Sequence, residues 1–552
     1  MKNRLLLLLF GFTFSSIIAQ DVPKNWFLMD RSEGYDGISA DKAYADILKD
    51  AKGETVVVAI IDSGIDIQHE DLKDNIWINL DEIPDNGKDD DGNGYIDDVY
   101  GWNFIGGPDG KNVGPDTYEV TRIFGKYDYK YKNADPSKLS GDDKKEYALY
   151  LKAKEEVEKA RDKASSQIAE LDKISERINS SLDMLSEKLG DNSLTIANVE
   201  KVEDTSPEIS VAKQVALEYL SKDGVNTMSD IKSAIQTDID SDKKRYQDQL
   251  DYAYNTDFDT RALIVKDNYA DATQSNYGNN DVEGPDPLHG THVAGIVGAV
   301  ADNGIGMNGV AKNVKLMSVR TVPDGDERDK DVANAIRYAV DNGASIINMS
   351  FGKAYSWNKG VVNDAVKYAA KHDVLMVHAA GNSAKNTDVE DNFPNDLIKE
   401  KGFFLCPKKE AKNWIEVGAL NFEKGEKAVA RFSNYGQDEV DLFSPGVKIY
   451  STMPNDEYAF LQGTSMASPV VAGVAAVIRS YFPTLTAEQV KEAIMESVVP
   501  IDGMVDVPGK KDTKQDFKEL SVTGGEVNLY NAILAAAKMK GKKKIDKKKI
   551  GA

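Results

Sequence analysis

Residues 55–62, Thr-Val-Val-Val-Ala-Ile-Ile-Asp, decide the fold that we expect for this chain. The segment is an apolar run rich in β-branched side chains, and it ends in Asp62. Such a run is typical of a strand that is buried on both faces, as strands of parallel sheets are. The sequence therefore predicts a buried parallel strand that carries a carboxylate where it emerges from the core.

Similar apolar runs recur along the chain, and helix-like patterns separate them. The strand candidates are residues 314–319, 345–349, 374–379 and 415–419, and the helix candidates are residues 289–300, 330–342, 359–372 and 465–481. Strands that alternate with helices of this length are typical of βαβ units. We therefore expect an α/β fold with a mainly parallel central sheet.

One long region interrupts this alternation. Between about residues 124 and 258 strand signals are almost absent and charges are frequent. Apolar residues there recur at steps of three and four, the pattern of one helix face: Leu171, Ile174, Ile178, Leu182, Leu185 and Leu189. We predict a helical insertion over residues 125–258. It is either a surface helical hairpin with its own small core or an element with a lid or maturation role.

The composition limits the classes of function. The 552 residues carry a formal net charge of −23, which argues against a nucleic-acid partner because such a partner calls for a basic surface. A hydrophobic content of 41% supports a real core. Cys406 is the only cysteine, so no disulfide within the chain can form. The sequence thus favours a globular protein that metal ions stabilise in place of disulfides.

The first residues are typical of an export signal. Lys2 and Arg4 precede a short apolar stretch, and small residues lead to a cut before Gln20. No later stretch has the length of a membrane span. We expect residues 1–19 to be a signal peptide and the protein to be periplasmic or extracellular.

Three short segments carry the chemistry. They are Ile-Ile-Asp-Ser-Gly-Ile-Asp at 60–66, His-Gly-Thr-His-Val-Ala-Gly at 289–295 and Gly-Thr-Ser-Met-Ala-Ser-Pro at 463–469. Ser465 stands at the expected start of a helix, where backbone N–H groups favour a negatively charged oxygen. A serine needs a base to become a nucleophile, and the base needs a group that orients it. His289 and Asp62 are the candidates for these two roles.

Together these segments resemble the three active-site signatures of the subtilisin-like serine peptidases (subtilases), and they occur in that family's order, Asp, His, Ser. The resemblance covers most of the chain from about Asn25 to about Ala537, apart from the insertion. It implies a subtilisin-like three-layer fold and a peptide hydrolase. In that hydrolase Ser465 attacks the carbonyl, His289 moves the proton and Asp62 orients the imidazole.

The resemblance also implies how substrate is held. Asn382, in Ala-Ala-Gly-Asn-Ser at 379–383, would donate its side-chain amide to the oxyanion. Ser350, Phe351 and Gly352 would pair with extended substrate as a neighbouring strand. Ala380 and Gly381 belong to a segment, 379–381, that would line one wall of the main specificity pocket, with room for a sizeable apolar side chain.

The second chemical site is an acidic loop at residues 89–98, Asp-Asp-Asp-Gly-Asn-Gly-Tyr-Ile-Asp-Asp. Its spacing imitates an EF-hand calcium loop, with a glycine at 94 for the turn and Tyr100 where the closing glutamate would stand. We therefore expect a structural calcium ion. The predicted ligands are Asp89, Asp91, Asn93, Asp97 and the carbonyl of Tyr95.

The resemblance divides the chain into five parts: a signal peptide (1–19), the start of a subtilase catalytic domain (20–124), the helical insertion (125–258), the remainder of the catalytic domain (259–538) and a basic tail (539–552). The segment between the signal and the first strand is too short for a propeptide domain. We expect a monomer that acts on protein or peptide substrates. Two alternatives stay open: a scaffolding protein with an inactive subtilase domain, and an esterase, which the surroundings of Ser465 and the triad order disfavour.

Overall fold

The computed structural model describes residues 22–190, 193–222, 224–399 and 409–543. The predicted signal peptide, Cys406 and most of the basic tail lie outside these ranges. The described residues form two compact units, which we call the catalytic unit (22–119 with 259–543) and the insertion unit (120–258). Within the described ranges, no helix combines the length and the apolar character that crossing a bilayer requires.

The catalytic unit is built on a nine-stranded sheet. Each neighbouring pair of strands is parallel except the pair at the β12 edge. The predicted α/β class with a mainly parallel sheet is therefore confirmed. In spatial order the strands are β12 (Val499–Pro500), β15 (Gly525–Glu526), β9 (Leu442–Pro445), β8 (Trp414–Leu420), β5 (Leu375–Ala379), β4 (Ile346–Met349), β1 (Val56–Asp62), β3 (Val314–Arg320) and β2 (Gly101–Asn103).

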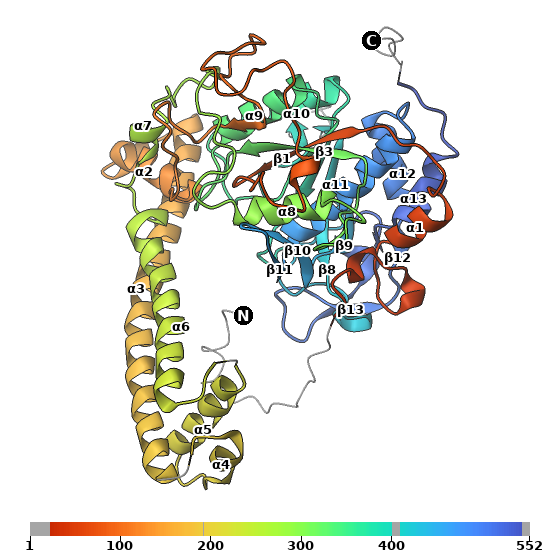
Figure 1. Cartoon of the computed structure of the whole chain (residues 1–552). Coiled ribbons are helices and arrows are strands. Elements are labelled where there is room, and N and C mark those ends of the chain that lie inside the picture. Colours follow the sequence, from red (N-terminus) through yellow and green to blue (C-terminus); the bar gives the residue numbers. More distant parts are fainter. Residues whose placement is uncertain (1–21, 191–192, 223, 400–408, 544–552) are drawn as a thin grey trace. The chain divides into compact units, whose positions relative to one another are not determined.

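Helices cover both faces of this sheet because its strands are apolar on both faces (Figure 1). Along β1, Val58 and Ile60 pack into one core with α8 (Leu288–Gly298) and α11 (Thr464–Tyr481). Ala59 and Ile61 pack into the other core with α9 (Asp329–Asp341) and α10 (Lys359–Lys371). Successive side chains of a strand point to opposite faces, so one short apolar run joins two cores and creates the three-layer fold.

Smaller elements complete the catalytic unit. The segment after the predicted signal peptide belongs to it, because Trp26 is fully buried and its Nε1 donates to the carbonyl of Lys448 at 2.9 Å. The other helices are α1 (Ala40–Asp46), α7 (Arg261–Ile264), α12 (Ala487–Met495) and α13 (Leu529–Ala536). Three strand pairs lie outside the central sheet: β6 (Leu397–Lys399) with β7 (Lys409–Glu410), β10 (Ile449–Met453) with β11 (Glu457–Leu461), and β13 (Met504–Asp506) with β14 (Lys514–Asp516).

The insertion unit is helical throughout its regular structure. Its helices are α2 (Glu119–Tyr131), α3 (Gly141–Leu189), α4 (Ile196–Lys201), α5 (Pro207–Leu220) and α6 (Met228–Asp248). The apolar residues of α3 that the sequence singles out pack against buried residues of α5 and α6 in a core of their own. The unit starts at residue 120, where the sequence analysis has 125, and it ends at residue 258. Its two ends meet, because the Thr121 hydroxyl donates to the carbonyl of Ala253 at 2.8 Å.

Candidate active site

Three neighbouring strands carry candidate residues at their carboxyl ends, on the same side of the sheet. The parallel strands β1, β4 and β5 lie side by side, and Asp62, Ser350 and Asn382 stand at or just after their carboxyl ends. Ligands of open parallel sheets bind at this edge. The first turns of α8 and α11 supply the remaining two candidates, His289 and Ser465.

Asp62 and His289 form a direct pair. The Asp62 Oδ1 atom lies 2.7 Å from Nδ1 of His289 and also accepts the backbone N–H of Ser63 at 2.7 Å. Asp62 is 1% exposed, and its Oδ2 has no hydrogen-bond partner among the described residues. A proton on Nδ1 of His289 would be held by the carboxylate, which leaves the lone pair on Nε2 for a reacting group.

The electrostatics of this pair act on the imidazole. Burial lowers the pKa of His289, but the charge and the hydrogen bond of Asp62 raise it and prevail, so the pKa is raised above its ordinary value. The His289 side chain is still 37% exposed, so a substrate can reach it. Its neighbour His292 differs. Burial lowers the pKa of His292 to about 3, and its Nε2 lies 3.1 Å from the carbonyl of Ala459, so His292 is a neutral structural residue.

Ser465 and Ser350 exchange hydrogen bonds. The Ser465 hydroxyl donates to the carbonyl of Ser350 at 3.0 Å, and the Ser350 hydroxyl donates to the carbonyl of Ser465 at 2.9 Å. The second bond has a cause in the sequence. Pro469 lies four residues after Ser465 within α11, and proline has no N–H to donate to that carbonyl. The carbonyl of Ser465 therefore has no donor within the helix at position 469, and it accepts the hydroxyl of Ser350 instead. This bond ties the start of α11 to the segment after β4.

Asn382 is fastened to the same helix start. Its Oδ1 accepts the backbone N–H of Thr464 at 2.9 Å and the Thr464 hydroxyl at 3.1 Å, so its Nδ2 remains the group that can donate. A Cβ placed on Gly463 would lie 3.4 Å from Nδ2 of Asn382 and 3.5 Å from the backbone nitrogen of Ser465. These two donors therefore border the same small space, as the donors of an oxyanion hole must.

The segments with substrate-binding candidates lie on both sides of this centre. Ser350 and Phe351 line a pocket of about 320 Å³ together with Asp62 and His289. Gly352 lies close to another segment, since a Cβ there would come within 2.9 Å of the Asn392 side chain. Gly381 has a φ of +101°, and a Cβ there would come within 2.6 Å of Nδ2 of Asn434 and 3.5 Å of Oδ1 of Asn392.

The side chain of Ala380 belongs to the hydrophobic core. Its side chain is fully buried and packs in a hydrophobic cluster with Leu420 and Phe443. Consecutive side chains of an extended segment point to opposite sides. Ala380 can therefore face a substrate only with its backbone.

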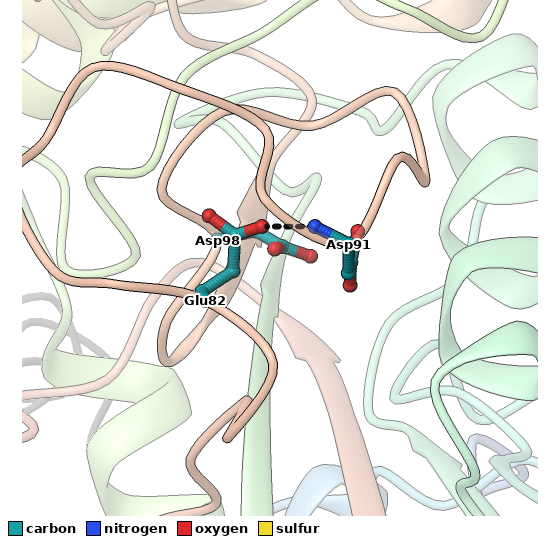
Figure 2. A group of neighbouring side chains, drawn as sticks. All are labelled: Glu82, Asp91 and Asp98. Atoms are coloured by element: carbon teal, nitrogen blue, oxygen red, sulfur yellow. Dashed lines mark hydrogen bonds between the residues drawn. The ribbon is translucent and has the colours of Figure 1, made fainter.

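The acidic loop gathers a different set of oxygen atoms from the set that its spacing predicts (Figure 2). Glu82, Asp91 and Asp98 each offer a carboxylate oxygen, and these oxygens all lie within 4.8 Å of one another. The carboxylate of Asp89 instead accepts the backbone N–H groups of Asn93 and Gly94. Glu82 and Asp98 thus belong to this acidic cluster, although the spacing of the loop does not predict them as ligands.

The other predicted ligands divide in the same way. The Asn93 side chain lies at the cluster, since its Nδ2 donates to Asp91 and to Asp98 at 3.0 Å each. The carboxylate of Asp97 accepts the N–H groups of residues 86 and 87. The carbonyl of Tyr95 stays a predicted ligand, and the ring of this residue packs 5.0 Å from that of Trp102. The spacing within the loop therefore does not predict which carboxylates converge, since Glu82 comes from a segment before the loop.

Asp98 is the most deeply placed member of the cluster. It is fully buried, and burial raises its pKa to about 6, against the hydrogen bonds from Tyr338, Asn93 and Asn79, which lower it. The charge of Asp91 adds to the increase. Converging carboxylates that repel one another in this way are the donor set that a hard divalent cation prefers. The oxygen atoms present therefore fit a calcium ion.

Comparison with known proteins places this site in a family. Residues 53–525 match the family model of the Subtilase family. The chain is 35% identical over 247 residues to the thermophilic serine proteinase of Bacillus sp. (strain AK1), an alignment that covers 44% of this chain and 52% of that protein. It is 38% identical over 207 residues to subtilisin DY of Bacillus licheniformis, which covers 37% of this chain and 68% of that protein.

A solved protease structure from Pseudoalteromonas arctica PAMC 21717 has 26% sequence identity and a TM-score of 0.37, over 47% of this chain and 78% of that chain. Among the curated relatives, the alignment spans about half of the first, the thermophilic serine proteinase. The family match, by contrast, runs across both sides of the insertion and includes Asp62, His289 and Ser465. The chain belongs to the Subtilase family.

Proposed function

We propose that the protein is an exported serine endopeptidase that hydrolyses peptide bonds with Asp62, His289 and Ser465. The observation that carries this proposal is the 2.7 Å contact between Asp62 Oδ1 and His289 Nδ1, made by residues that are 227 positions apart in the sequence. Membership of the Subtilase family supports it. The names of the relatives, a serine proteinase and a subtilisin, agree with this activity.

The proposed reaction starts with a rotation of the Ser465 side chain. Its hydroxyl leaves the carbonyl of Ser350, to which it donates, and turns toward Nε2 of His289. Catalytic hydrogen bonds are often absent without substrate and form in the substrate complex. The oxygen of Ser465 attacks the carbonyl carbon while His289 takes the proton, and His289 then gives that proton to the leaving amine.

The negative oxygen of the tetrahedral intermediate needs donors that are already in place. Nδ2 of Asn382 and the N–H of Ser465 are positioned for this task by the bonds that tie Asn382 to Thr464. Removal of one such donor costs about a hundredfold or more in turnover. We therefore expect Asn382→Ala to lower kcat by that factor and to change KM little.

A covalent label tests the proposal against an inactive scaffold. A fluorophosphonate probe should label the wild-type protein at Ser465 and should not label Ser465→Ala. The Ser350→Ala variant is the control, because it keeps the nucleophile and loses only the Ser350 hydroxyl, which donates to the carbonyl of Ser465 and accepts from Nδ2 of Asn348. Absence of labelling in folded wild-type protein would support the scaffold and contradict the peptidase.

We also propose that calcium binds at Glu82, Asp91 and Asp98 and stabilises the fold. The convergence of their oxygens within 4.8 Å supports this, as does the burial of Asp98. When bound, the cation would neutralise carboxylates that otherwise repel one another. Its role would be structural, in a chain whose single cysteine allows no internal disulfide.

Chelation tests the calcium proposal. Removal of divalent cations should lower the Tm of the wild-type protein, and added calcium but not magnesium should restore it. The Asp98→Asn variant should have a Tm that no longer responds to calcium. Asp89→Asn is the matched control, because Asp89 belongs to the same loop but not to the three carboxylates whose oxygens converge, so its variant should keep the response. A wild-type Tm that chelator leaves unchanged would remove this proposal.

The proposed export and the role of the insertion can each be tested. We propose that the signal peptide is cut before Gln20, and the burial of Trp26 supports retention of the residues that follow. Sequencing the amino terminus of the secreted protein tests this, because a start at any residue other than Gln20 would contradict the proposed cut, and a start beyond residue 28 would also contradict retention of Trp26. Deletion of residues 120–258 tests the insertion: full activity on small and large substrates alike would exclude a lid role.

A further inference from the structure

The chain bends sharply after β5, where it carries Asn382. We call residues 380–385 the oxyanion loop. Within it Gly381 has a φ of +101° and Ala384 has a φ of +55°. The second value is unfavourable for a residue that has a Cβ. The bend therefore needs contacts with another segment of the chain to hold it.

Asn434 supplies such contacts with its side chain. Its Nδ2 donates to the carbonyl of Ala380 at 2.7 Å. Its Oδ1 accepts the backbone N–H of Ser383 at 3.1 Å and that of Lys385 at 2.9 Å. These bonds lie on both sides of Asn382 along the chain. A single side chain thus fixes the path of the backbone that presents Asn382.

Asn434 is itself held by the central sheet. Its backbone N–H donates to the carbonyl of Gly381 at 2.9 Å. Its carbonyl accepts the hydroxyl of Ser433 at 2.8 Å, and the same hydroxyl oxygen accepts the N–H of Ala419 at 2.9 Å. Ala419 belongs to β8, which neighbours β5. Since Asn434 is 4% exposed and Ser433 is fully buried, this support is part of the core.

The direction of the Asn382 amide depends on where the oxyanion loop lies. Thr464 holds the amide oxygen of Asn382, and the Thr464 hydroxyl also accepts the N–H of Gly381 at 3.1 Å. The backbone of the rest of the loop is fixed elsewhere, and Asn434 contacts it at Ser383 and Lys385. A misplacement of about 1 Å in an active site can cost about a hundredfold in rate. The position of this loop should therefore affect turnover.

We propose that Asn434 is a positioning residue, which holds the oxyanion loop so that Nδ2 of Asn382 meets the negative oxygen of the tetrahedral intermediate. The proposal rests on the peptidase function proposed above and adds a residue that acts through Asn382. Ser383 is exposed, so water can reach its N–H when the acceptor is removed. We therefore expect Asn434→Ala to fold while its oxyanion loop is held less firmly.

Steady-state kinetics on a fluorogenic peptide test the proposal. In Asn434→Ala, kcat should fall by about tenfold or more, but by no more than in Asn382→Ala, which removes the donor itself. KM should change by less than about twofold, because the negative oxygen does not exist in the bound substrate. A kcat within about twofold of the wild-type value would overturn the proposal.

A double-mutant cycle separates positioning from a general structural role. If Asn434 acts through Asn382, then Asn434→Ala should change kcat by about twofold or less once residue 382 is alanine. An equal loss in both backgrounds would overturn the proposal. Should Asn434→Ala not fold, Asn434→Asp gives the same cycle with the same two outcomes, since it keeps the acceptor and loses only the donor to Ala380.

Asn413 provides a matched control at the other end of β5. It is 2% exposed, and its Nδ2 donates to the carbonyl of Val374 at 2.7 Å. Val374 directly precedes β5, whereas Asn382 follows its carboxyl end. Asn413→Ala should lower the Tm and leave kcat unchanged. A loss of kcat as large as that in Asn434→Ala would show that general destabilisation causes both losses, and it would contradict the proposal.

Failure of the peptidase function looks different from failure of this inference. In that case no peptide is cleaved and the fluorophosphonate probe does not label Ser465. Cleavage and labelling of Ser465, together with equal losses in both arms of the cycle, would contradict only the role of Asn434.

Discussion

The catalytic unit and the insertion unit use charged residues in opposite ways. In the catalytic unit the Arg261 and Asp331 side chains are 3% and 0% exposed, and two hydrogen bonds of 2.6 and 2.8 Å join them. In the insertion unit the Arg245 and Asp242 side chains are 50% and 15% exposed and lie 3.3 Å apart. A buried pair loses much when one partner is removed, whereas an exposed pair contributes little.

The difference teaches where each unit gets its stability. The buried pair of Arg261 and Asp331 joins α7 to α9 in the catalytic unit, and removal of one charge leaves its partner unpaired in the core. The insertion unit relies instead on an apolar stripe of α3 that packs against α5 and α6. Its exposed charges keep long helices solvated.

The largest effect is expected at the buried pair. Arg261→Met leaves Asp331 without its cation and should lower the free energy of unfolding of the catalytic unit by about 3–5 kcal/mol. Arg261 also donates to Asp267 at 3.1 Å, which adds to the loss. Urea denaturation followed by Trp fluorescence measures it. A change below about 1 kcal/mol would break the contrast between the units.

The next effect concerns the core of the insertion unit. Leu182 is fully buried, and Leu182→Ala should cost about 2–5 kcal/mol through the lost contacts and the cavity left behind. Hydrogen exchange should become faster in α3, α5 and α6, while hydrolysis of a short peptide stays unchanged. Leu151→Ala, at a position that is 46% exposed, is the matched control and should change neither.

A pH profile sharpens the comparison at the active site. The pKa of His289 is raised from its ordinary 6.5 because Asp62 outweighs burial. The base must be neutral to act, so kcat/KM should fall as the pH drops through a midpoint above 6.5. In Asp62→Asn the residual activity should show this midpoint at lower pH. An acid limb of the wild-type protein below 6.5 would contradict the assignment of His289 as the base.

The smallest effect is expected at the exposed pair. Arg245→Met makes the same chemical change as Arg261→Met but should alter the stability of the insertion unit by no more than about 0.5 kcal/mol. Hydrogen exchange in α6 gives the measurement. A loss comparable to that of Arg261→Met would show that the exposed charges stabilise the insertion after all.

The strands that could be predicted from the sequence are those with long apolar runs. Residues 55–61 and 314–319 predict β1 and β3 well, because a strand buried on both faces leaves no polar positions. Strands of two or three residues, such as β2 and β12, give no periodic signal and stayed hidden. Helix α3 could be predicted because its apolar residues recur on one face, and the packing of this face against α5 and α6 also stabilises it.

The candidate site divides in a similar way. Asp62 and His289 could be predicted because each stands in a characteristic local motif, and the structure brings them together. Glu82 and Asp98 could not, because their convergence on Asp91 depends on how the loop folds back.

The hydrogen bond between Thr121 and Ala253 has a consequence for how this chain could have grown. A segment whose beginning and end touch can be added to a host, or lost from it, without moving the host's strands and with little entropy of closure. Most of the 227 positions between Asp62 and His289 are therefore a detour of the backbone. Such an insertion can become longer in evolution while Asp62 and His289 stay within hydrogen-bond distance of each other.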